Sequence, residues 1–185
     1  MAVLQSIRNL FVAPQEAEPE VVMPAPPTSY EIRLLTDANL REVLRLNIRC
    51  FQNGDSYTKH TFSYLLHEPQ TLSYQAVTPT GEIVGFIFVM VNDNGAAHLT
   101  TIGVAPEHRR RGIAASLLTH AESMLCKKGS STVMLEVRVS NVAAQTLYRQ
   151  LGYSAVQRVR NYYNNGEDCF LMMKSLTPPE RLYQI

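Results

Sequence analysis

The sequence has little of what would mark several common classes of protein. Its three cysteines, Cys50, Cys126 and Cys169, lie far apart and form no C-x-x-C pair, so neither a disulfide framework nor a zinc site is indicated. Its apolar runs fall well short of the roughly 18 residues that a membrane-spanning helix needs. The formal net charge is only +1, whereas general binding to nucleic acid needs a broad excess of lysine and arginine. We therefore expect no metal, no membrane contact and no direct nucleic-acid partner.

The amino-terminal end differs in composition from the rest of the chain. Prolines and glutamates crowd residues 13–29, and such a mixture keeps a chain extended and buries little of it. Residues 1–12 lack the compact apolar core and the cleavage site of a secretory signal. We predict a flexible extension at residues 1–29, one domain at residues 30–176, a short tail at residues 177–185 and a cytoplasmic location.

The apolar pattern of the domain predicts a mixed α/β (α+β) fold. Runs typical of strands occupy residues 30–34, 72–77, 83–91, 97–104, 132–138, 153–160 and 168–175. Apolar residues three and four apart favour helices at residues 36–51, 59–67, 109–127 and 141–151. Tight turns link the strands between residues 72 and 104 into an antiparallel meander, whereas the later strand–helix–strand passage needs a parallel crossover. The expected core is a mixed, mostly antiparallel sheet of about seven strands flanked by about four helices.

An arginine-rich segment lies between a predicted strand and the longest predicted helix. Residues 104–114 read VAPEHRRRGIA. The first turn of a helix carries unpaired N–H groups and a partial positive charge, so a diphosphate can bind there if small residues let it approach. A solvated basic turn is the alternative. Cations at a helix N-terminus oppose the helix dipole, however, which is easier to understand if an anion is normally bound there.

This segment resembles the Q/R-x-x-G-x-G/A signature of the GNAT fold. The matching residues are Arg109, Gly112 and Ala114, and the order of elements matches over residues 30–176. The resemblance implies that acetyl-CoA is the cosubstrate, and that the strand ending at residue 104 splays away from the strand beginning at residue 132. It further implies that the pantetheine arm and the pyrophosphate contact Ile102, Gly103, Val104, Arg109, Arg110, Arg111, Gly112, Ile113 and Ala114.

A single carboxylate interrupts the apolar strand predicted at residues 132–138. Alternation places Glu136 on the same face as Met134 and Arg138. A carboxylate on an interior strand is costly unless it is paired or used, and partial burial suits a carboxylate to act as a general base. Two interpretations stay open at this point, an ion pair between Glu136 and Arg138 or a catalytic base.

A longer motif spans residues 135–153. It reads L-E-V-R-x-S-N-x-x-A-x-x-L-Y-x-x-L-G-Y and resembles the ribosomal-protein N-acetyltransferase (RimI) family almost letter for letter. The helical pattern alone places Tyr148 beside a core stripe of Ala144, Leu147 and Leu151, and so favours a core tyrosine. The resemblance instead implies that Glu136 is the general base, that Tyr148 is the general acid and that Asn141 binds the cofactor.

A further segment points to the substrate. Residues 160–169, RNYYNNGEDC, are similar to the K/R-x-Y-Y-x-x-G-E-D-A segment of RimI and of archaeal and eukaryotic N-terminal acetyltransferases. The resemblance implies that Tyr162 grips the backbone of the substrate, while Tyr163 can also be read as an aromatic anchor of the turn. Phe51 and Tyr57 bound the loop where such enzymes contact the first side chain.

The chemistry of amines separates the possible substrates. An α-amino group has a reference pKa of about 7.7–8.0 and lysine one of about 10.4, so a single modest base suits an α-amine better. The predicted function is transfer of an acetyl group from acetyl-CoA to the N-terminal α-amino group of a protein or peptide, with a ribosomal protein as one candidate. Acetylation of lysine side chains or small-molecule amines, and a non-catalytic acetyl-CoA-binding subunit, are the alternatives.

Overall fold

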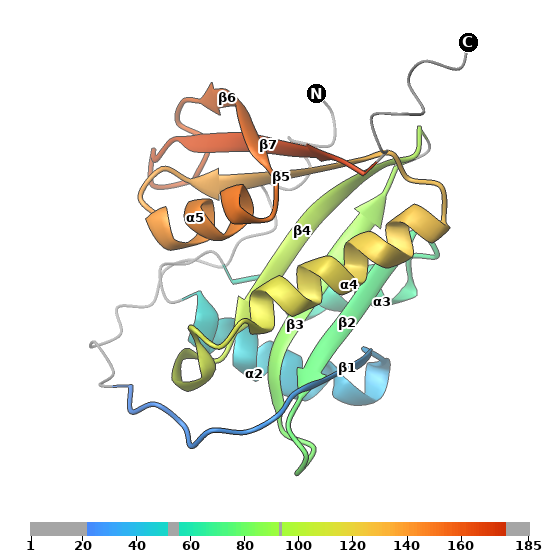
Figure 1. The fold of residues 1–185 in the computed structure, drawn as a ribbon, viewed down its shortest axis with the longest axis vertical. Helices are drawn as coiled ribbons and strands as arrows, with labels where there is room; N and C mark the ends of the chain where they lie inside the picture. Colours follow the sequence, from blue (N-terminus) through green and yellow to red (C-terminus); the bar gives the residue numbers. More distant parts are fainter. Residues whose placement is uncertain (1–21, 52–55, 93, 177–185) are drawn as a thin grey trace.

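The computed structural model describes residues 22–51, 56–92 and 94–176. Its centre is a seven-stranded sheet with the strand order β1-β2-β3-β4-β5-β7-β6, and every neighbouring pair is antiparallel except β4 and β5 (Figure 1). The strands are β1 (Glu31–Leu34), β2 (Thr71–Val77), β3 (Ile83–Val91), β4 (Ala96–Val104), β5 (Thr132–Arg138), β6 (Ser154–Val159) and β7 (Cys169–Ser175). The α-helices of the described residues are α2 (Leu40–Cys50), α3 (Lys59–His67), α4 (Ile113–Lys127) and α5 (Val142–Gln150). The predicted fold class is therefore confirmed.

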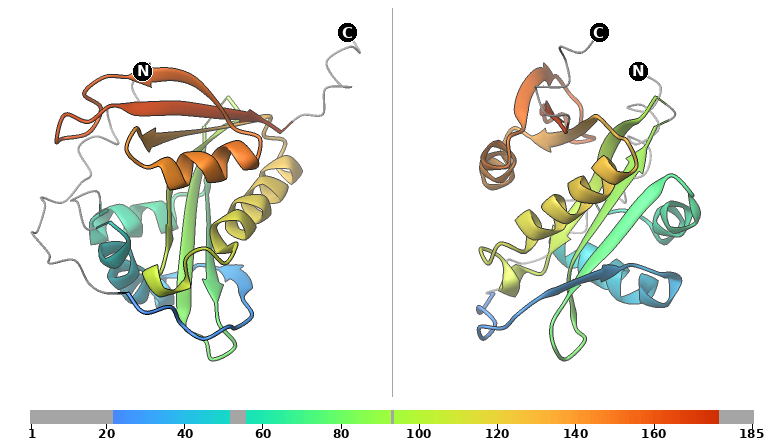
Figure 2. Two further views of the ribbon diagram at one scale, coloured as in Figure 1. Left: turned by 60° about the vertical axis from the view of Figure 1, so that its left-hand side comes forward. Right: turned by 45° about the vertical axis from the view of Figure 1, so that its right-hand side comes forward.

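The helices form a layer on each side of the sheet (Figure 2). On one side, Phe62 of α3 packs its ring against Phe86 and Phe88 of β3, and all three side chains are fully buried. On the other side, α4 lies so close to β3 that a Cβ added to Gly85 would stand 3.0 Å from the Ile113 side chain. Alternate residues of β3 thus pack against opposite helical layers, which explains why this strand is a nearly continuous apolar run.

The two halves of the sheet separate between β4 and β5. These parallel strands pair only from Ala96 opposite Thr132 to His98 opposite Met134. Beyond these residues β4 continues to Val104 and β5 to Arg138 without pairing to each other, while β4 stays paired with β3 and β5 with β7. The predicted splay of these two strands is present, and it opens the centre of the sheet.

The buried carboxylate of Glu122 helps to hold the two halves of the sheet together. Glu122 of α4 accepts a hydrogen bond of 2.8 Å from the Tyr153 hydroxyl and pairs with Lys174 of β7 at 2.5 Å. The longest helix is thereby fixed to the half of the sheet that contains β5, β6 and β7. These side-chain contacts therefore help to keep the two halves in place on either side of the opening between β4 and β5.

Most element boundaries lie within one residue of the sequence-based prediction, but two α-helices start later than predicted. The helix predicted at residues 36–51 opens as a 3-10 helix (Asp37–Asn39) and becomes α2 only at Leu40. The second late start is that of α4. The helix begins at Ile113, not near residue 109, because Gly112 has a φ of 78° and Arg110 a φ of 63°. Left-handed residues cannot continue a right-handed helix. The three arginines therefore lie in the loop before the helix rather than in its first turn.

Part of the predicted extension contacts the domain. The backbone N–H of Ala25 donates to the Glu107 carbonyl at 3.0 Å, and Arg111 donates to the carbonyl oxygens of Ala25 and Pro26. Residues 25 and 26 thus lie against the loop that precedes α4. Residues 1–21 and 177–185, which complete the predicted extension and tail, lie outside the described residues. Among the described helices, none has the length and apolar character needed to cross a membrane.

Candidate active site

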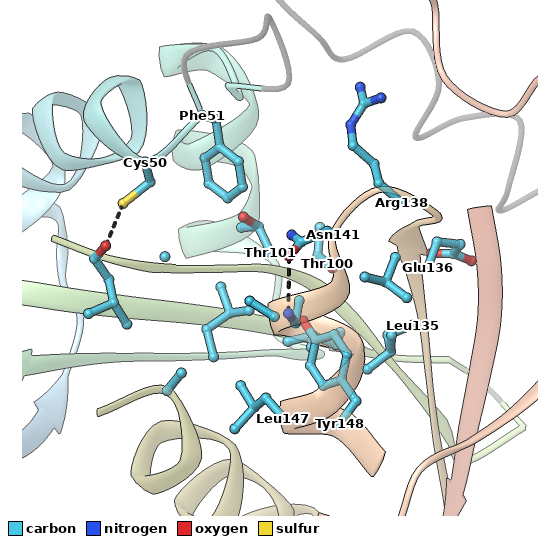
Figure 3. Close-up of a pocket in the computed structure, with 18 of the residues that line it drawn as sticks. Cys50, Phe51, Thr100, Thr101, Leu135, Glu136, Arg138, Asn141, Leu147 and Tyr148 are labelled. Atoms are coloured by element: carbon cyan, nitrogen blue, oxygen red, sulfur yellow. Dashed lines mark hydrogen bonds between the residues drawn. The ribbon is translucent and has the colours of Figure 1, made fainter. Parts of the chain in front are cut away.

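A cleft of about 410 Å³ lies where β4 and β5 diverge (Figure 3). Its walls come from β4, β5, α5, the end of α2 and the segment between β6 and β7. The predicted residues that line it are Glu136, Tyr148, Phe51, Tyr57, Tyr162, Ile102, Gly103, Val104, Arg109, Ala114 and Asn141. Arg110, Arg111, Gly112 and Ile113 are not among the lining residues. The structure therefore brings both predicted catalytic residues and the predicted substrate residues to one cavity.

Glu136 is held by a histidine that the sequence analysis did not single out. Its Oε2 lies 2.7 Å from Nε2 of His98, and the two side chains are 7% and 2% exposed. His98 is the last residue of β4 that pairs with β5, and Glu136 lies two residues beyond its pairing partner Met134. The hydrogen bond therefore closes the narrow end of the opening between the two strands.

The ion pair between Glu136 and Arg138, one of the two interpretations that the sequence leaves open, is not formed. Arg138 donates instead to Oε2 of Glu167 at 2.6 Å and lies 3.7 Å from the centre of the Tyr163 ring. Because Oε1 of Glu136 is buried and has no hydrogen-bond partner among the described residues, this carboxylate has an unused acceptor beside the cleft. A buried acceptor without a donor is costly, so an incoming N–H or water would be favoured there.

Tyr148 faces the same cleft from α5. Gln145 and Tyr148 are the buried residues of this helix, while the predicted stripe of Ala144, Leu147 and Leu151 is partly buried and packs against the core. The Tyr148 side chain is 6% exposed, and burial raises the pKa of its hydroxyl. The hydroxyl is therefore protonated at neutral pH, as a proton donor must be.

The loop before α4 presents its backbone to solvent at the helix N-terminus. Gly112, the residue that precedes the helix, has open space where a Cβ would be. The Arg109 side chain donates from Nε to the Val104 carbonyl at 3.2 Å and so lies along the end of β4. The amides at the start of a 15-residue helix, with the exposed Arg109 and Arg110 in the loop just before it, suit a diphosphate.

Arg111 differs from its two neighbours. Besides its contacts with Ala25 and Pro26, it donates to the Tyr30 hydroxyl at 3.1 Å, and that hydroxyl lies 3.0 Å from Nδ1 of His108. This arginine therefore ties residues 22–30 to the loop. Its predicted role in holding the pyrophosphate stays a prediction.

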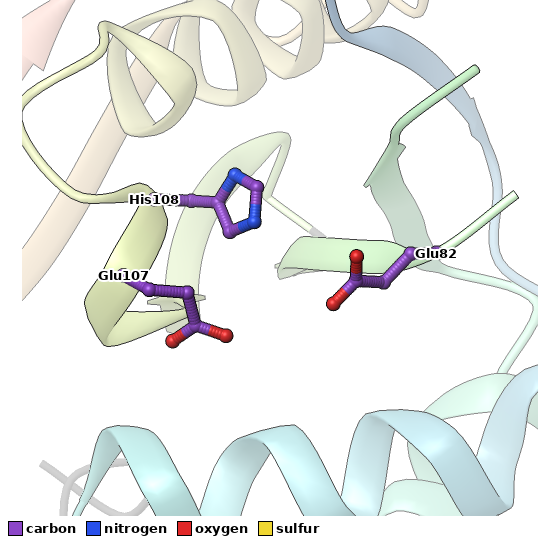
Figure 4. A group of neighbouring side chains, drawn as sticks. All are labelled: Glu82, Glu107 and His108. Atoms are coloured by element: carbon purple, nitrogen blue, oxygen red, sulfur yellow. The ribbon is translucent and has the colours of Figure 1, made fainter. Parts of the chain in front are cut away.

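The short 3-10 helix ahead of this loop (Pro106–His108) carries a small polar cluster. A carboxylate oxygen of Glu82, a carboxylate oxygen of Glu107 and a ring nitrogen of His108 lie within 4.8 Å of one another (Figure 4). Glu107 is paired with Arg49 of α2 at 2.7 Å, and the charge of Arg49 contributes to the lowered pKa of this carboxyl. The contacts of Glu107 with Arg49 and Ala25, and of His108 with Tyr30, show that this cluster supports the loop before α4.

Two side chains close the wall between β5 and α5. Asn141 caps α5 by accepting a hydrogen bond of 3.0 Å from the Ala144 N–H. Gln145 donates to the Arg138 and Val139 carbonyls at 3.0 and 2.9 Å. The end of β5 and the start of α5 are thereby held rigidly, which fixes Glu136 relative to Tyr148.

Aromatic residues form the opposite wall. Tyr162 and Tyr163 are both 8% exposed, and their rings meet edge to face at 5.1 Å. Glu167 holds this segment because its carboxylate accepts from the Ser140 N–H at 2.9 Å as well as from Arg138, and these hydrogen bonds lower its pKa. Arg138 and Tyr163 thus line the cleft in addition to the predicted Tyr162.

The carboxyl end of α2 and its following residues complete the cleft. Phe51 lies at the wall, and the Tyr57 hydroxyl donates to the Thr100 carbonyl at 3.0 Å, beside the irregular register of β4. Residues 52–55 of the predicted side-chain loop lie outside the described residues. Gly103 must lack a side chain, because a Cβ there would stand 2.6 Å from the Phe86 ring.

The cysteines are poorly suited to a covalent relay. Cys50 lines the cleft, but burial raises the pKa of its thiol to about 11, and it donates to the Val104 carbonyl at 3.3 Å. Burial, reinforced by the nearby charge of Glu136, raises the pKa of Cys169 to about 12. The thiolate is the nucleophile in cysteine chemistry, and neither residue supplies it near neutral pH.

Comparison with known proteins gives a consistent assignment. The model of the acetyltransferase (GNAT) family matches residues 40–153. An N-alpha-acetyltransferase of Sulfurisphaera tokodaii is 30% identical over 159 residues, which cover 80% of this chain and 93% of that protein. N-alpha-acetyltransferase MAK3 of Arabidopsis thaliana is 33% identical over 135 residues, or 71% of this chain and 70% of that protein.

Solved structures agree with the sequence relatives. The crystal structure of the ribosomal-protein-S18-alanine N-acetyltransferase from Escherichia coli superimposes with a TM-score of 0.74 and 31% identity, covering 84% of this chain and 99% of that one. The structure of Ard1 from Thermoplasma volcanium, at 22% identity and a TM-score of 0.73, shares the fold. The chain therefore belongs to the GNAT acetyltransferase family and is an N-acetyltransferase.

Proposed function

We propose that the protein transfers the acetyl group of acetyl-CoA to the N-terminal α-amino group of a protein. The observation that carries this proposal is the placement of Glu136 and Tyr148 in one cleft at the opening between β4 and β5. The related proteins of S. tokodaii and A. thaliana are named as N-alpha-acetyltransferases. The E. coli relative is named for the alanine of ribosomal protein S18, so a ribosomal protein in the cytoplasm is a reasonable first substrate to test.

The cosubstrate fits the cofactor end of the cleft. The α4 N-terminus and its loop hold the pyrophosphate through backbone N–H groups, with Arg109 and Arg110 as countercharge. The pantetheine arm follows the unpaired edge of β4 at Ile102, Gly103 and Val104, where backbone groups no longer bond to β5. Asn141 faces this arm from the start of α5. The thioester then lies between Glu136 and Tyr148.

The reaction is a direct transfer between amine and thioester. The amine nitrogen attacks the carbonyl carbon, and Glu136 takes one proton from the nitrogen, directly or through one water. A backbone N–H near Val104 stabilises the oxyanion. When the carbon–sulfur bond breaks, the Tyr148 hydroxyl gives its proton to the departing thiolate and is reprotonated from solvent, while Glu136 releases its proton to solvent. The products are the acetylated amine and coenzyme A.

The amine side suits a peptide backbone. Tyr162, Tyr163 and Phe51 line the mouth of the cleft with aromatic surface, and Arg138 is already neutralised by Glu167. A channel for a polyamine or a lysine would need a cluster of carboxylates in its walls. Among the described residues that line the cleft, Glu136 is the one carboxylate. Tyr162 contacts the first backbone units, and Phe51 and Tyr57 contact the first side chain.

One assay tests the proposal. The protein is incubated with acetyl-CoA and three matched peptides, one with a free α-amine and no lysine, one with a blocked α-amine and a lysine, and one with both amines blocked. Mass spectrometry with fragmentation locates any added acetyl group. We expect acetylation of the first peptide only. Acetylation confined to the lysine peptide would contradict the proposal.

A further inference from the structure

We propose that Arg111 is a positioning residue for the cofactor loop (residues 109–112), and that residues 25–30, which we call the brace, hold this loop in the shape that binds the cofactor. The inference rests on the proposed binding of the cofactor pyrophosphate at the start of α4. The brace precedes residues 40–153, which the GNAT family model matches. It is therefore a feature of this chain that lies outside the matched region.

The side chain of Arg111 is committed to the brace. Its guanidinium donates from Nη1 to the Pro26 carbonyl at 2.7 Å and to the Tyr30 hydroxyl at 3.1 Å, and from Nη2 to the Ala25 carbonyl. A guanidinium carries five N–H donors in a rigid fork, so it can hold several acceptors at once. Arg111 is accordingly partly buried, whereas its neighbours Arg109 and Arg110 are exposed.

Tyr30 extends these contacts to the 3-10 helix ahead of the loop. Its hydroxyl lies 3.0 Å from Nδ1 of His108, and the two rings meet edge to face at 5.7 Å. Because arginine has no acceptor, the hydroxyl accepts from Arg111 and gives its own proton to Nδ1. The Ala25 N–H also donates to the Glu107 carbonyl at 3.0 Å. The brace thus holds both the 3-10 helix and the loop that follows it.

The backbone of the cofactor loop needs support of this kind. Arg110 and Gly112, on either side of Arg111, have φ angles of 63° and 78°. A left-handed conformation is unfavourable for a residue with a side chain, and it persists where the surrounding contacts over-determine it. Glycine adopts this conformation readily and leaves it just as readily. Fixing the Arg111 side chain restricts both neighbours, and so stabilises the loop that presents the first amides of α4.

The brace contacts the loop on the side away from the cleft. Arg109 and Ala114 line the cleft, whereas Arg111 and the brace are not among its described lining residues. In Figures 1 and 2 the loop before α4 lies between helix α5 and the blue segment that contains the brace. A diphosphate that binds from the cleft therefore leaves the brace in place. A loop that is already in its binding shape binds more tightly, because the apparent affinity is reduced by the fraction of molecules that are not competent.

The test is a double-mutant cycle on the full chain. Tyr30→Phe keeps the ring against His108 and removes the hydroxyl, whereas Arg111→Lys keeps the positive charge and removes the guanidinium fork. Both single variants and the double variant are compared with the parent protein. Calorimetry gives Kd for coenzyme A, steady-state kinetics give kcat and the two KM values, and thermal unfolding gives the melting temperature. Hydrogen exchange follows the N–H groups of Ala25 and His108, which bond to the Glu107 and Ala105 carbonyls.

Two matched controls make the same chemical changes at exposed sites. Tyr64→Phe removes a hydroxyl that donates to Glu68 on the surface of α3. Arg33→Lys removes a guanidinium that pairs with Glu31 on β1. Both controls should keep the parent values of Kd and kcat.

We expect Kd for coenzyme A to rise about 3-fold in Tyr30→Phe and about 10-fold in Arg111→Lys, with kcat within about two-fold of the parent value. KM for the peptide should not change. The double variant should bind no more weakly than Arg111→Lys, because residues that act as one unit are not additive. The Ala25 and His108 N–H groups should exchange faster in all three variants.

Different failures separate the brace from the function itself. If either single variant keeps the parent Kd, or if the two losses add in full, the brace is refuted and the binding of the cofactor stands. Tighter binding in Tyr30→Phe would show that residues 25–30 compete with the cofactor, which also refutes the brace. If the parent protein itself does not bind coenzyme A, the proposed function fails, whereas hydrogen exchange still decides whether these residues hold the loop.

Discussion

The two ends of the cleft are built in opposite ways. The cofactor end consists largely of backbone groups. They are the start of α4 and Gly112, which has a left-handed backbone conformation, together with the arginines of the preceding loop. The amine end is made of buried side chains that hold one another, with His98 on Glu136 and Glu167 on Arg138. On the proposed assignment, the cofactor end binds a constant anion with backbone groups, while the amine end depends on a few exact side-chain contacts. Substitutions should therefore affect chemistry or the peptide at one end and cofactor affinity at the other.

Glu136→Gln should have the largest effect. The substitution keeps the size of the side chain and removes the basic oxygen, so kcat should fall about 10²-fold or more. KM for acetyl-CoA should change little, because the cofactor loop is untouched. Steady-state kinetics with a free-α-amine peptide measure both values. An unchanged kcat would remove Glu136 from the mechanism.

Tyr148→Phe should come next. The ring remains to fill the core position against Tyr153, but the proton donor to the thiolate is lost, and kcat should fall about 10- to 100-fold. Thermal unfolding serves as the control, since the buried ring is retained. Parent activity in a folded Tyr148→Phe protein would show that the thiolate takes its proton elsewhere.

Glu167→Ala sharpens the contrast between the ends. It removes the hydrogen bonds that Glu167 accepts from Arg138 and from the Ser140 N–H, and so loosens the segment that carries Tyr162 and Tyr163. We expect KM for the peptide to rise about 10-fold because this wall of the cleft is no longer held in place, while calorimetry shows the affinity for acetyl-CoA within about two-fold of the parent value. Equal losses at both substrates would indicate general unfolding.

Gly112→Ala probes the cofactor end. A Cβ at this position meets open space, so the cost is the left-handed backbone alone, about 1 kcal/mol. The free energy of unfolding should fall by that amount, and KM for acetyl-CoA should rise about five-fold with kcat for bound peptide retained. A specific loss of peptide affinity would contradict the division of the cleft.

Cys50→Ser should have the smallest effect. The thiol donates a weak hydrogen bond to the Val104 carbonyl, and serine can do the same. Because burial raises the thiol pKa to about 11, iodoacetamide at pH 7.5 should label Cys50 slowly, and labelling should become faster as the pH rises. The exposed Cys126 serves as an internal reference. Loss of activity in Cys50→Ser would instead favour a mechanism in which the Cys50 thiolate carries the acetyl group.

The same contrast explains how much of the molecule could be predicted from sequence. The bounds of α3, β3 and β5 were predicted to the residue, because apolar periodicity and turn residues are local signals. The cofactor end is also predicted from a short local motif, and its role in holding acetyl-CoA stays a prediction. The start of α4 was misplaced because three arginines give no sign of the positive φ angles at Arg110 and Gly112.

The amine end could be predicted only in part. Glu136 stood out as a lone carboxylate in an apolar strand, but its partner His98 is 38 residues away, and nothing local marks it. Arg138 was paired with Glu136 by alternation, whereas the segment between β6 and β7 brings Glu167 to it from 29 residues away. Contacts of this kind depend on the register of β5 with β4 and β7, which a single sequence does not specify.

The most direct test of the account is a crystal structure with a bisubstrate compound in which coenzyme A is joined through an acetyl link to the α-nitrogen of a short peptide. We predict the pyrophosphate at the N-terminus of α4, and the α-nitrogen in the opening between β4 and β5, within hydrogen-bond reach of Glu136 directly or through one water. A peptide that enters elsewhere, with its α-nitrogen remote from Glu136, would contradict the account.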